Sequence, residues 1–149
     1  MTYVRQSVRN AVTNILGTVP DVKVFESRVH PLSKDDIPCF IVKSGSQIIE
    51  PAVKSRMQPA LQKRWIETEV YCFARATDNI EDALDKLAAI VENKVLGEPT
   101  LGSIAAETIL QDTQSFIGGE PSFPLGACRM SFMSLVLTRE GYPETPIRN

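Results

Sequence analysis

The sequence predicts an α+β fold in two layers, with two helices on one face of a mainly antiparallel or mixed sheet. Two stretches have apolar residues at helical spacing, five have strand patterns, and the links between consecutive strands are short. The predicted order is helix, three strands, helix, two strands. Residues 1–140 are expected to form one domain, followed by an extended tail over 141–149 because Pro143 and Pro146 oppose a helix there.

The first helix is predicted near residues 3–16. Val8, Val12 and Ile15 fall on one face at spacings of three and four, as in an amphipathic helix packed on a core. Gly17 is well placed to end this helix, because glycine is common just past a helix C-terminus.

The second helix is predicted near residues 79–96, where Leu84, Leu87 and Val91 form the apolar stripe. Asp78 precedes it and Glu81 follows three residues later, which is the spacing of a capping box. We therefore expect Asp78 to be the N-cap residue.

Five segments have the composition of strands. They are Val22–Val29, Cys39–Val42, Trp65–Arg75, Glu107–Phe116 and Ala127–Thr138. The second is almost entirely apolar and the last is rich in apolar residues, so both are expected to be central in the sheet. The fourth is polar enough to lie at an edge or to have one face in water.

The segment Ser44–Lys63 interrupts this pattern with one glycine and two prolines. Two interpretations remain open. It forms either a long loop or projecting arm, or a protruding hairpin, since Gln47–Glu50 has some strand character.

The basic residues Lys54, Arg56, Lys63 and Arg64 lie in and beside this segment. They are the candidate protein-interface residues of the chain. A solvated loop and a nucleic-acid contact are the alternatives, although no aromatic residues alternate with these cations as they do in a single-strand binding groove.

Composition describes an ordinary globular chain. Its 149 residues are 43% hydrophobic and 23% charged, with a formal net charge of −2. The charge balance gives no overall attraction to nucleic acid or to an anionic membrane. No apolar run approaches the ~20 residues that cross a bilayer, and the N-terminus lacks the apolar core of a secretory signal. We expect a cytoplasmic protein that binds neither membranes nor specific nucleic acid.

Residues for catalysis are few. His30 is the single histidine, and Cys39, Cys72 and Cys128 lie in apolar strand patterns without metal-ligand spacing. The carboxylates Glu67 and Glu69 alternate outward on one strand, as ordinary solvated residues do. The sequence therefore predicts three buried cysteines, no metal, no cofactor and no enzymatic activity.

Several short phrases carry a likeness to a known family. They are Val24–Pro31, Asp36–Val42, Ile66–Tyr71, Ala76–Leu84, Glu98–Gly102 and the last strand with its end at Leu137-Thr138. In this order, over nearly the whole chain, they resemble the tail terminator family of long-tailed bacteriophages, which includes the lambda-type minor tail protein U.

The resemblance implies a structural role in the virion. Proteins of this family form a ring, commonly a hexamer, at the head-proximal end of the tail tube, where they stop tube polymerisation and join the head connector. It implies three partners for this chain: copies of itself, the tail-tube protein and the head–tail connector protein. The implied location is the host cytoplasm during assembly and then the virion tail. Another head–tail joint or tail completion protein, and a small ligand-binding domain, are the alternatives.

Overall fold

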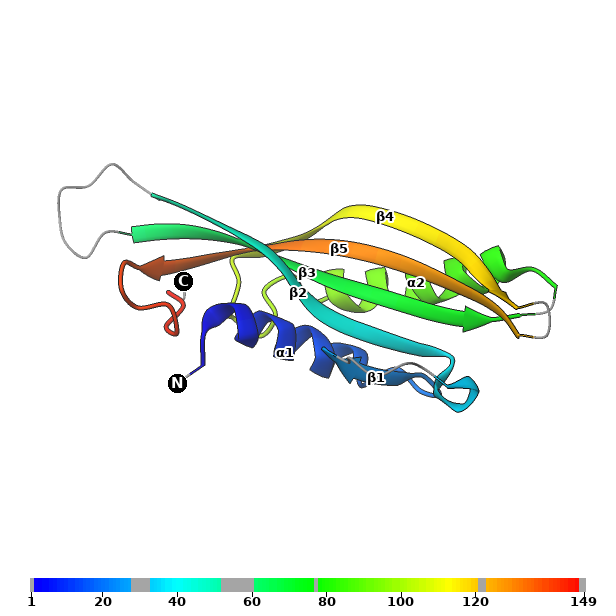
Figure 1. Ribbon diagram of the computed structural model, residues 1–149. Coiled ribbons are helices and arrows are strands. Elements are labelled where there is room, and N and C mark those ends of the chain that lie inside the picture. The colour runs from blue at the N-terminus through cyan, green and yellow to red at the C-terminus, as the bar shows by residue number, and fades with distance from the viewer. Residues whose placement is uncertain (1, 28–32, 52–60, 77, 121–122, 148–149) are drawn as a thin grey trace.

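The computed structural model describes residues 2–27, 33–51, 61–76, 78–120 and 123–147. Within these residues the chain forms two α-helices, one short 3-10 helix and five strands (Figure 1). The elements follow in the order α1 (Val4–Leu16), β1 (Lys23–Glu26), η1 (Lys34–Asp36), β2 (Cys39–Pro51), β3 (Leu61–Arg75), α2 (Ile80–Leu96), β4 (Glu107–Glu120) and β5 (Phe123–Arg139). This confirms the predicted fold class and order.

The described strands form one sheet in the order β1-β2-β3-β5-β4. β1 runs parallel to β2, and the other three pairings are antiparallel, so the sheet is mixed. The Cys39–Val42 segment and β5 are internal, and β4 is an outer strand, as their composition predicted. The first strand is shorter than expected and ends at Glu26.

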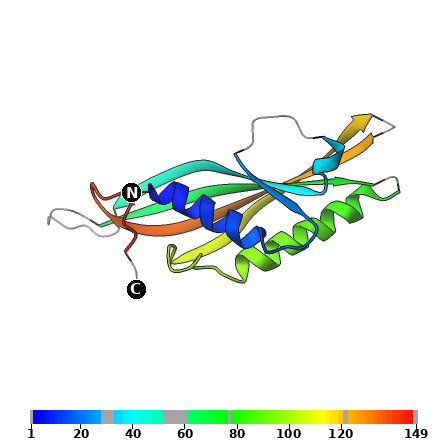
Figure 2. The same cartoon turned by 90° about the horizontal axis from the view of Figure 1, so that it is seen from below.

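Both helices cover the same face of the sheet (Figure 2). Between the two layers lies a core that includes Val8, Val12, Phe40, Val70 and Phe132, all at 0% exposure. β5 carries a glycine, Gly126, where the first turn of α2 approaches. A Cβ at this position would lie 2.6 Å from Ile80 Cγ1 and 2.8 Å from Leu84 Cδ1, so the missing side chain lets the helix pack closely on the strand.

The helix boundaries agree with prediction, but three local details differ. The N-cap of α2 is Asn79, whose side-chain oxygen accepts from the Asp82 backbone N–H at 3.1 Å, so the cap lies one residue after Asp78. In α1 the last fully buried residue is Leu16, while Ile15 is only partly buried. Gly17 follows the helix as expected, yet its φ of −63° is right-handed and does not require glycine.

The expectation of a long loop or arm over residues 44–63 is wrong for most of its length. β2 continues through Ser44 to Pro51 and β3 begins at Leu61, with the two strands paired up to Pro51 and Gln62. A bulge between Ser44 and Gln47 places Gly45 and Ser46 opposite a single residue of β3. The strands continue as a hairpin, which was the alternative interpretation. Residues 52–60 lie outside the described part.

The segment after β5 forms turns and folds back onto the domain. The Val4 backbone N–H donates to Pro143 O at 2.8 Å, and the Ile147 N–H donates to Leu137 O at 2.7 Å. Its described residues contain no helix, in agreement with the prolines, but they are less extended than predicted. The N-terminal helix and the C-terminal segment are thereby joined at one end of the sheet.

Candidate functional site: the open face of the sheet

The two faces of the sheet differ in what covers them. Directly paired residues share a face, so the register assigns each side chain to one side. The helix-covered face takes Arg64, Ile66, Thr68 and Val70 of β3, all buried. The face on the other side, which we call the open face, is covered by neither α1 nor α2 (Figure 1).

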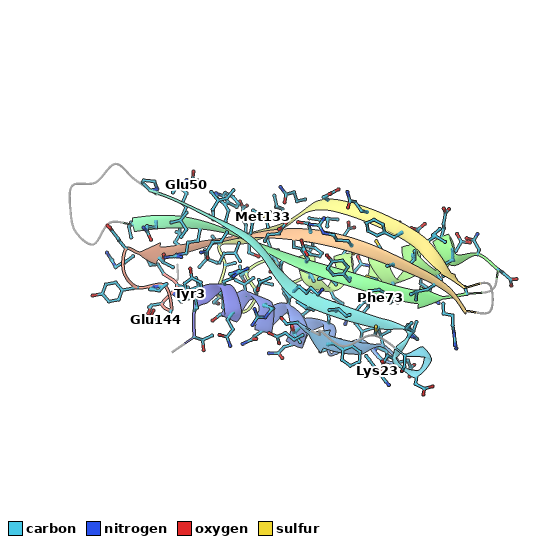
Figure 3. The ribbon with its side chains drawn as sticks, in the orientation of Figure 1. Tyr3, Lys23, Glu50, Phe73, Met133 and Glu144 are labelled. Carbon is cyan, nitrogen blue, oxygen red and sulfur yellow. The ribbon has the colours of Figure 1, made fainter. Side chains whose placement is uncertain are left out.

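Defined by register, the open face comprises alternate residues of the four long strands. They are residues 39, 41, 43, 48 and 50 of β2, the odd-numbered residues of β3 and β5, and residues 107, 109, 112, 114, 116 and 118 of β4. Met133 and Glu50 point away from the helices, whereas Tyr3 lies on the side of α1 (Figure 3). Trp65, Tyr71, Phe73, Met133 and Leu135 are half-buried there, so the face combines large apolar side chains with charges.

Arg129 of β5 is the centre of the charged part of this face. Its Nη2 atom lies 2.7 Å from Glu69 Oε1 and 3.6 Å from Glu67 Oε2, and its Nη1 atom lies 3.8 Å from Asp112 Oδ2. Three strands contribute to this group, since Glu67 and Glu69 come from β3 and Asp112 from β4. Three carboxylates therefore surround one guanidinium, which leaves the group acidic.

Further hydrogen bonds hold the two glutamates in place. Ser131 Oγ donates to Glu67 Oε2 at 2.6 Å, the Ser46 backbone N–H donates to Glu67 Oε1 at 3.1 Å, and Tyr71 Oη donates to Glu69 Oε2 at 3.0 Å. The bulge in β2 provides the room, because a Cβ on Gly45 would lie 2.1 Å from Glu67 Oε1. The missing side chain at Gly45 thus allows the Glu67 carboxylate to reach the β2 backbone.

The hydrogen bonds shift the proton affinity of these groups. The Ser131 hydroxyl, followed by the Ser46 N–H and the charge of Arg129, lowers the pKa of Glu67 against the opposing effect of its burial. Burial, and then the bond to Glu69, raises the pKa of Tyr71. Glu67 stays ionised near neutral pH and is poorly suited to donate a proton, so this arrangement favours electrostatic recognition over acid catalysis.

A second polar cluster lies on the helix-covered face, near the start of α1. Arg64 is 5% exposed, and it donates from Nε to Thr138 Oγ1 at 2.8 Å and from Nη1 to Tyr3 Oη at 3.1 Å. Gln47 Nε2 also donates to Tyr3 Oη, at 2.8 Å. This bond and the nearby guanidinium groups of Arg64 and Arg5 lower the pKa of Tyr3. No carboxylate among the described residues lies within ion-pair distance of Arg64.

The structure does not bring the predicted basic residues together where it describes them. Lys63 belongs to the open face and Arg64 is buried on the other side, because neighbouring residues of a strand point in opposite directions. Arg64 is thus a structural residue of the Tyr3 cluster, not a surface contact. Lys54 and Arg56 lie outside the described residues, as does His30.

The acidic group around Arg129 is what sequence reasoning missed. Glu67 and Glu69 were expected to be solvated, but their side chains are only 16% and 19% exposed. The sequence could not show that a cation of another strand faces them, because this depends on which strands are neighbours. The sequence held one signal: Arg129 interrupts the otherwise apolar start of the last strand.

The cysteines are buried as predicted, with Cys39 and Cys72 at 0% and Cys128 at 2% exposure. Burial raises the pKa of the Cys72 and Cys128 thiols, which disfavours a reactive thiolate. Within the described ranges, no three histidine, cysteine or carboxylate side chains are grouped as a metal site would require.

A groove of about 390 Å³ lies on the helix side, between α2 and the segments before β1 and β2. Its lining is mainly apolar, including Val22, Ile37 and Leu87, with Lys86 among the lining residues. Its size falls at the lower end of small-molecule sites. Asp21 and Arg75 are the other charged residues of the lining, and the two polar clusters described above lie elsewhere.

Comparison with known proteins gives no family assignment. No family model matches the sequence, and the curated proteins include no significant match. Among the helices that the structure describes, none is both long and apolar enough to span a membrane.

Proposed function

We propose that this chain is a structural protein of a phage or prophage virion, a tail terminator that assembles as a ring at the head-proximal end of the tail tube. It stops tube polymerisation there and binds the head connector. In this proposal it is not an enzyme and requires no cofactor. It acts in the host cytoplasm during assembly and then in the virion tail.

The open face is the observation that carries the proposal. A sheet surface without a helix layer, with Trp65, Phe73 and Met133 beside the acidic group around Arg129, has the mixed apolar and charged character of a protein-binding surface. This adds to the likeness of the sequence to tail terminators, which extends over nearly the whole chain. Both favour a macromolecular partner over a small substrate.

Deletion of the gene in its own phage or prophage tests the function directly. Electron microscopy of lysates should show tails of irregular and excessive length that fail to join heads, and a plasmid copy should restore normal virions. Tails of normal length that fail to join heads would instead identify the chain as another head–tail joint protein. Normal virions would eliminate both roles.

A pair of variants tests whether the open face is the binding surface. Met133→Glu places a charge at the centre of this face, and Leu96→Glu makes the same change at a half-buried residue of α2, on the opposite layer and outside the groove. Provided both fold by circular dichroism, only Met133→Glu should fail to restore tail length. Equal loss in both, or none in either, would remove the open face from the proposal.

The basic residues outside the described part remain candidate contacts. Reversal of charge at Lys54 and Arg56 together should weaken capture of tube ends, with a defect that grows as salt is lowered, because a positive patch steers docking onto an acidic rim. Reversal at Lys86 and Lys94, two exposed cations of α2, is the matched control.

The groove beside α2 is the observation that favours the second candidate, a small ligand-binding domain. Under that hypothesis an apolar small molecule should raise the melting temperature, and Leu87→Ala or Ile37→Ala should reduce the shift. Complementation of tail length by both variants would exclude this groove from the virion function.

A further inference from the structure

The exposed apolar side chains are concentrated on two strands. Among the described residues, the large hydrophobic side chains classed as exposed are Tyr3, Ile48, Ile49, Ile109, Phe116, Ile117 and Tyr142. Ile48 and Ile49 lie in the second half of β2, and Ile109, Phe116 and Ile117 lie in β4. Neighbouring apolar residues of one strand point to opposite faces, so in both places the apolar surface wraps around the strand.

Both segments are free edges of the described sheet. β1 pairs with β2 only over Cys39–Val42, so no described strand pairs with Lys43–Pro51 on that side. β4 pairs with β5 alone over its whole length. Each segment therefore has a side that no described strand pairs, beside exposed apolar side chains. In β2 two backbone groups are bonded to side chains, since the Gly45 C=O accepts from Arg5 and the Ser46 N–H donates to Glu67.

The two segments carry little of the usual protection against edge pairing. Lys43 and Pro51 stand only at the ends of the β2 segment, and β2 has one bulge, between Ser44 and Gln47. Monomeric proteins place lysine or proline on exposed edge strands to prevent association. Residues 107–120 contain no lysine, arginine or proline, and residues 44–50 contain none either. The bulge between Leu110 and Asp112 is the one irregularity in the described register of β4.

The strand directions make these two edges compatible. β4 is antiparallel to β5, β5 to β3 and β3 to β2, so β4 and β2 run in opposite directions at the two sides of the sheet. When a second copy is added in the same orientation, its β2 lies antiparallel beside β4 of the first. We propose that β4 of one copy pairs in this way with residues 44–51 of β2 in a second copy.

Charge favours this contact over pairing of β4 with itself. β4 carries three acids, Glu107, Asp112 and Glu120, and no cation, so two β4 strands would bring like charges together. The β2 edge is flanked by Lys43, and Arg5 donates to Gly45 O at 2.6 Å. The one acid of the β2 edge, Glu50, already accepts from Trp65 Nε1 at 3.2 Å.

One register of the β4–β2 pairing places compatible side chains opposite each other. Ile48 and Phe116 both belong to the open face, and placing them opposite each other gives a pair of a β-branched and an aromatic residue. Glu50 then lies opposite Gln114, with no acid facing an acid. The contact is heterologous, which leaves one free edge at each end of a pair and closes only in a ring. The inference rests on the proposed function, because it supplies the subunit interface of the proposed ring.

Disulfide cross-linking tests the pairing and its register. Glu50→Cys combined with Gln114→Cys should give a ladder of covalent oligomers under mild oxidation, and each single variant should give none. The native cysteines are at most 2% exposed and do not compete. Glu50→Cys with Thr113→Cys is the control, since Thr113 belongs to the opposite face. Covalent dimers of Gln114→Cys alone would show β4 self-pairing and overturn the proposal, as would equal ladders in the control.

A lysine substitution in β4 tests the edge contact without cross-linking. Phe116→Lys should be monomeric by light scattering at concentrations where the wild type is oligomeric. Tyr142→Lys is the matched control, because Tyr142 is 53% exposed and Phe116 is 54% exposed, but Tyr142 lies outside both edges. An oligomeric Phe116→Lys protein, or a wild type that is monomeric at every concentration, would refute the inference.

The two proposals fail separately. If the cross-links form and deletion of the gene leaves virions normal, the interface is supported and the terminator function is refuted. If deletion gives over-long tails while Phe116→Lys still forms rings, the function stands and this interface falls.

Discussion

Replacement of Arg129 by glutamine tests the acidic group on the open face most directly. Arg129 makes one charge-assisted hydrogen bond, at 2.7 Å to Glu69, while its contacts with Glu67 and Asp112 at 3.6 Å and 3.8 Å are longer. A hydrogen bond to a charged group contributes about 1.5–3 kcal/mol. The Arg129 side chain is 21% exposed and Asp112 is 52% exposed, so we expect the lower end, about 1.5–2 kcal/mol at neutral pH.

The pH dependence of this loss follows from the direction of the Glu67 shift. The pKa of Glu67 is lowered in the folded protein, so it contributes stability above its unfolded pKa, and this stability is lost as pH falls through the folded pKa. Without Arg129 the pKa of Glu67 is lowered less, so the variant loses less stability as the pH falls. The difference between the unfolding free energies of the two proteins should therefore be smaller in acid, where Glu67 is protonated, than at neutral pH.

Urea denaturation at about pH 7 and at about pH 3 measures both effects. Lys63→Gln is the matched control, because Lys63 is a cation of the same face without an ion pair among the described residues, and it should change stability by less than about 0.5 kcal/mol. A loss in Arg129→Gln that is equal at the two pH values would refute the electrostatic reasoning. A loss no larger than that of the control would do the same.

Three further predictions concern stability and reactivity. Leu84→Ala should destabilise the protein by about 3–5 kcal/mol because Leu84 is 1% exposed, and Leu87→Ala by about 2–3 kcal/mol because Leu87, at 8%, already borders the groove. Chemical denaturation measures both losses, and a near-zero loss would contradict the packing of α2. Asn79→Ala should lower the unfolding free energy by about 1 kcal/mol and Asp78→Ala by much less. A larger loss in Asp78→Ala would show that Asp78 is the N-cap residue. The three cysteines should react slowly with a thiol reagent in native protein and fully in denaturant, so rapid labelling of any one would contradict their burial.

Sequence reasoning recovered the elements whose pattern is decided locally. The stripes of the two helices and the apolar Cys39–Val42 run identify buried surfaces without knowledge of their partners. The N-cap was misplaced by one residue because Asp78 and Asn79 are both good caps, each with an acid three positions later. Only the φ and ψ angles of the folded chain choose between them.

Features that depend on strand pairing could not be predicted. The glycine and prolines of Ser44–Lys63 indicated a loop or, as the alternative, a hairpin. The second half of β2 lies along a free edge, where a strand needs no apolar alternation, so its pattern could not decide between them. The group around Arg129 requires β3, β4 and β5 to be neighbours in a fixed register. The candidate site was therefore missed. Of the four predicted basic residues, the two that the structure describes, Lys63 and Arg64, lie on opposite faces because they alternate along β3.

The alternation along β3 also has an evolutionary consequence. Its even-numbered residues from Arg64 to Ala74 are buried under the helices, and its odd-numbered residues belong to the open face. Selection for folding limits substitutions in the first set. Selection for binding to a partner limits substitutions in the second set. Homologues that change partner should therefore diverge at every second residue of this strand. A mutational scan that scores cellular abundance and assembly separately should divide the same strand into two interleaved lists.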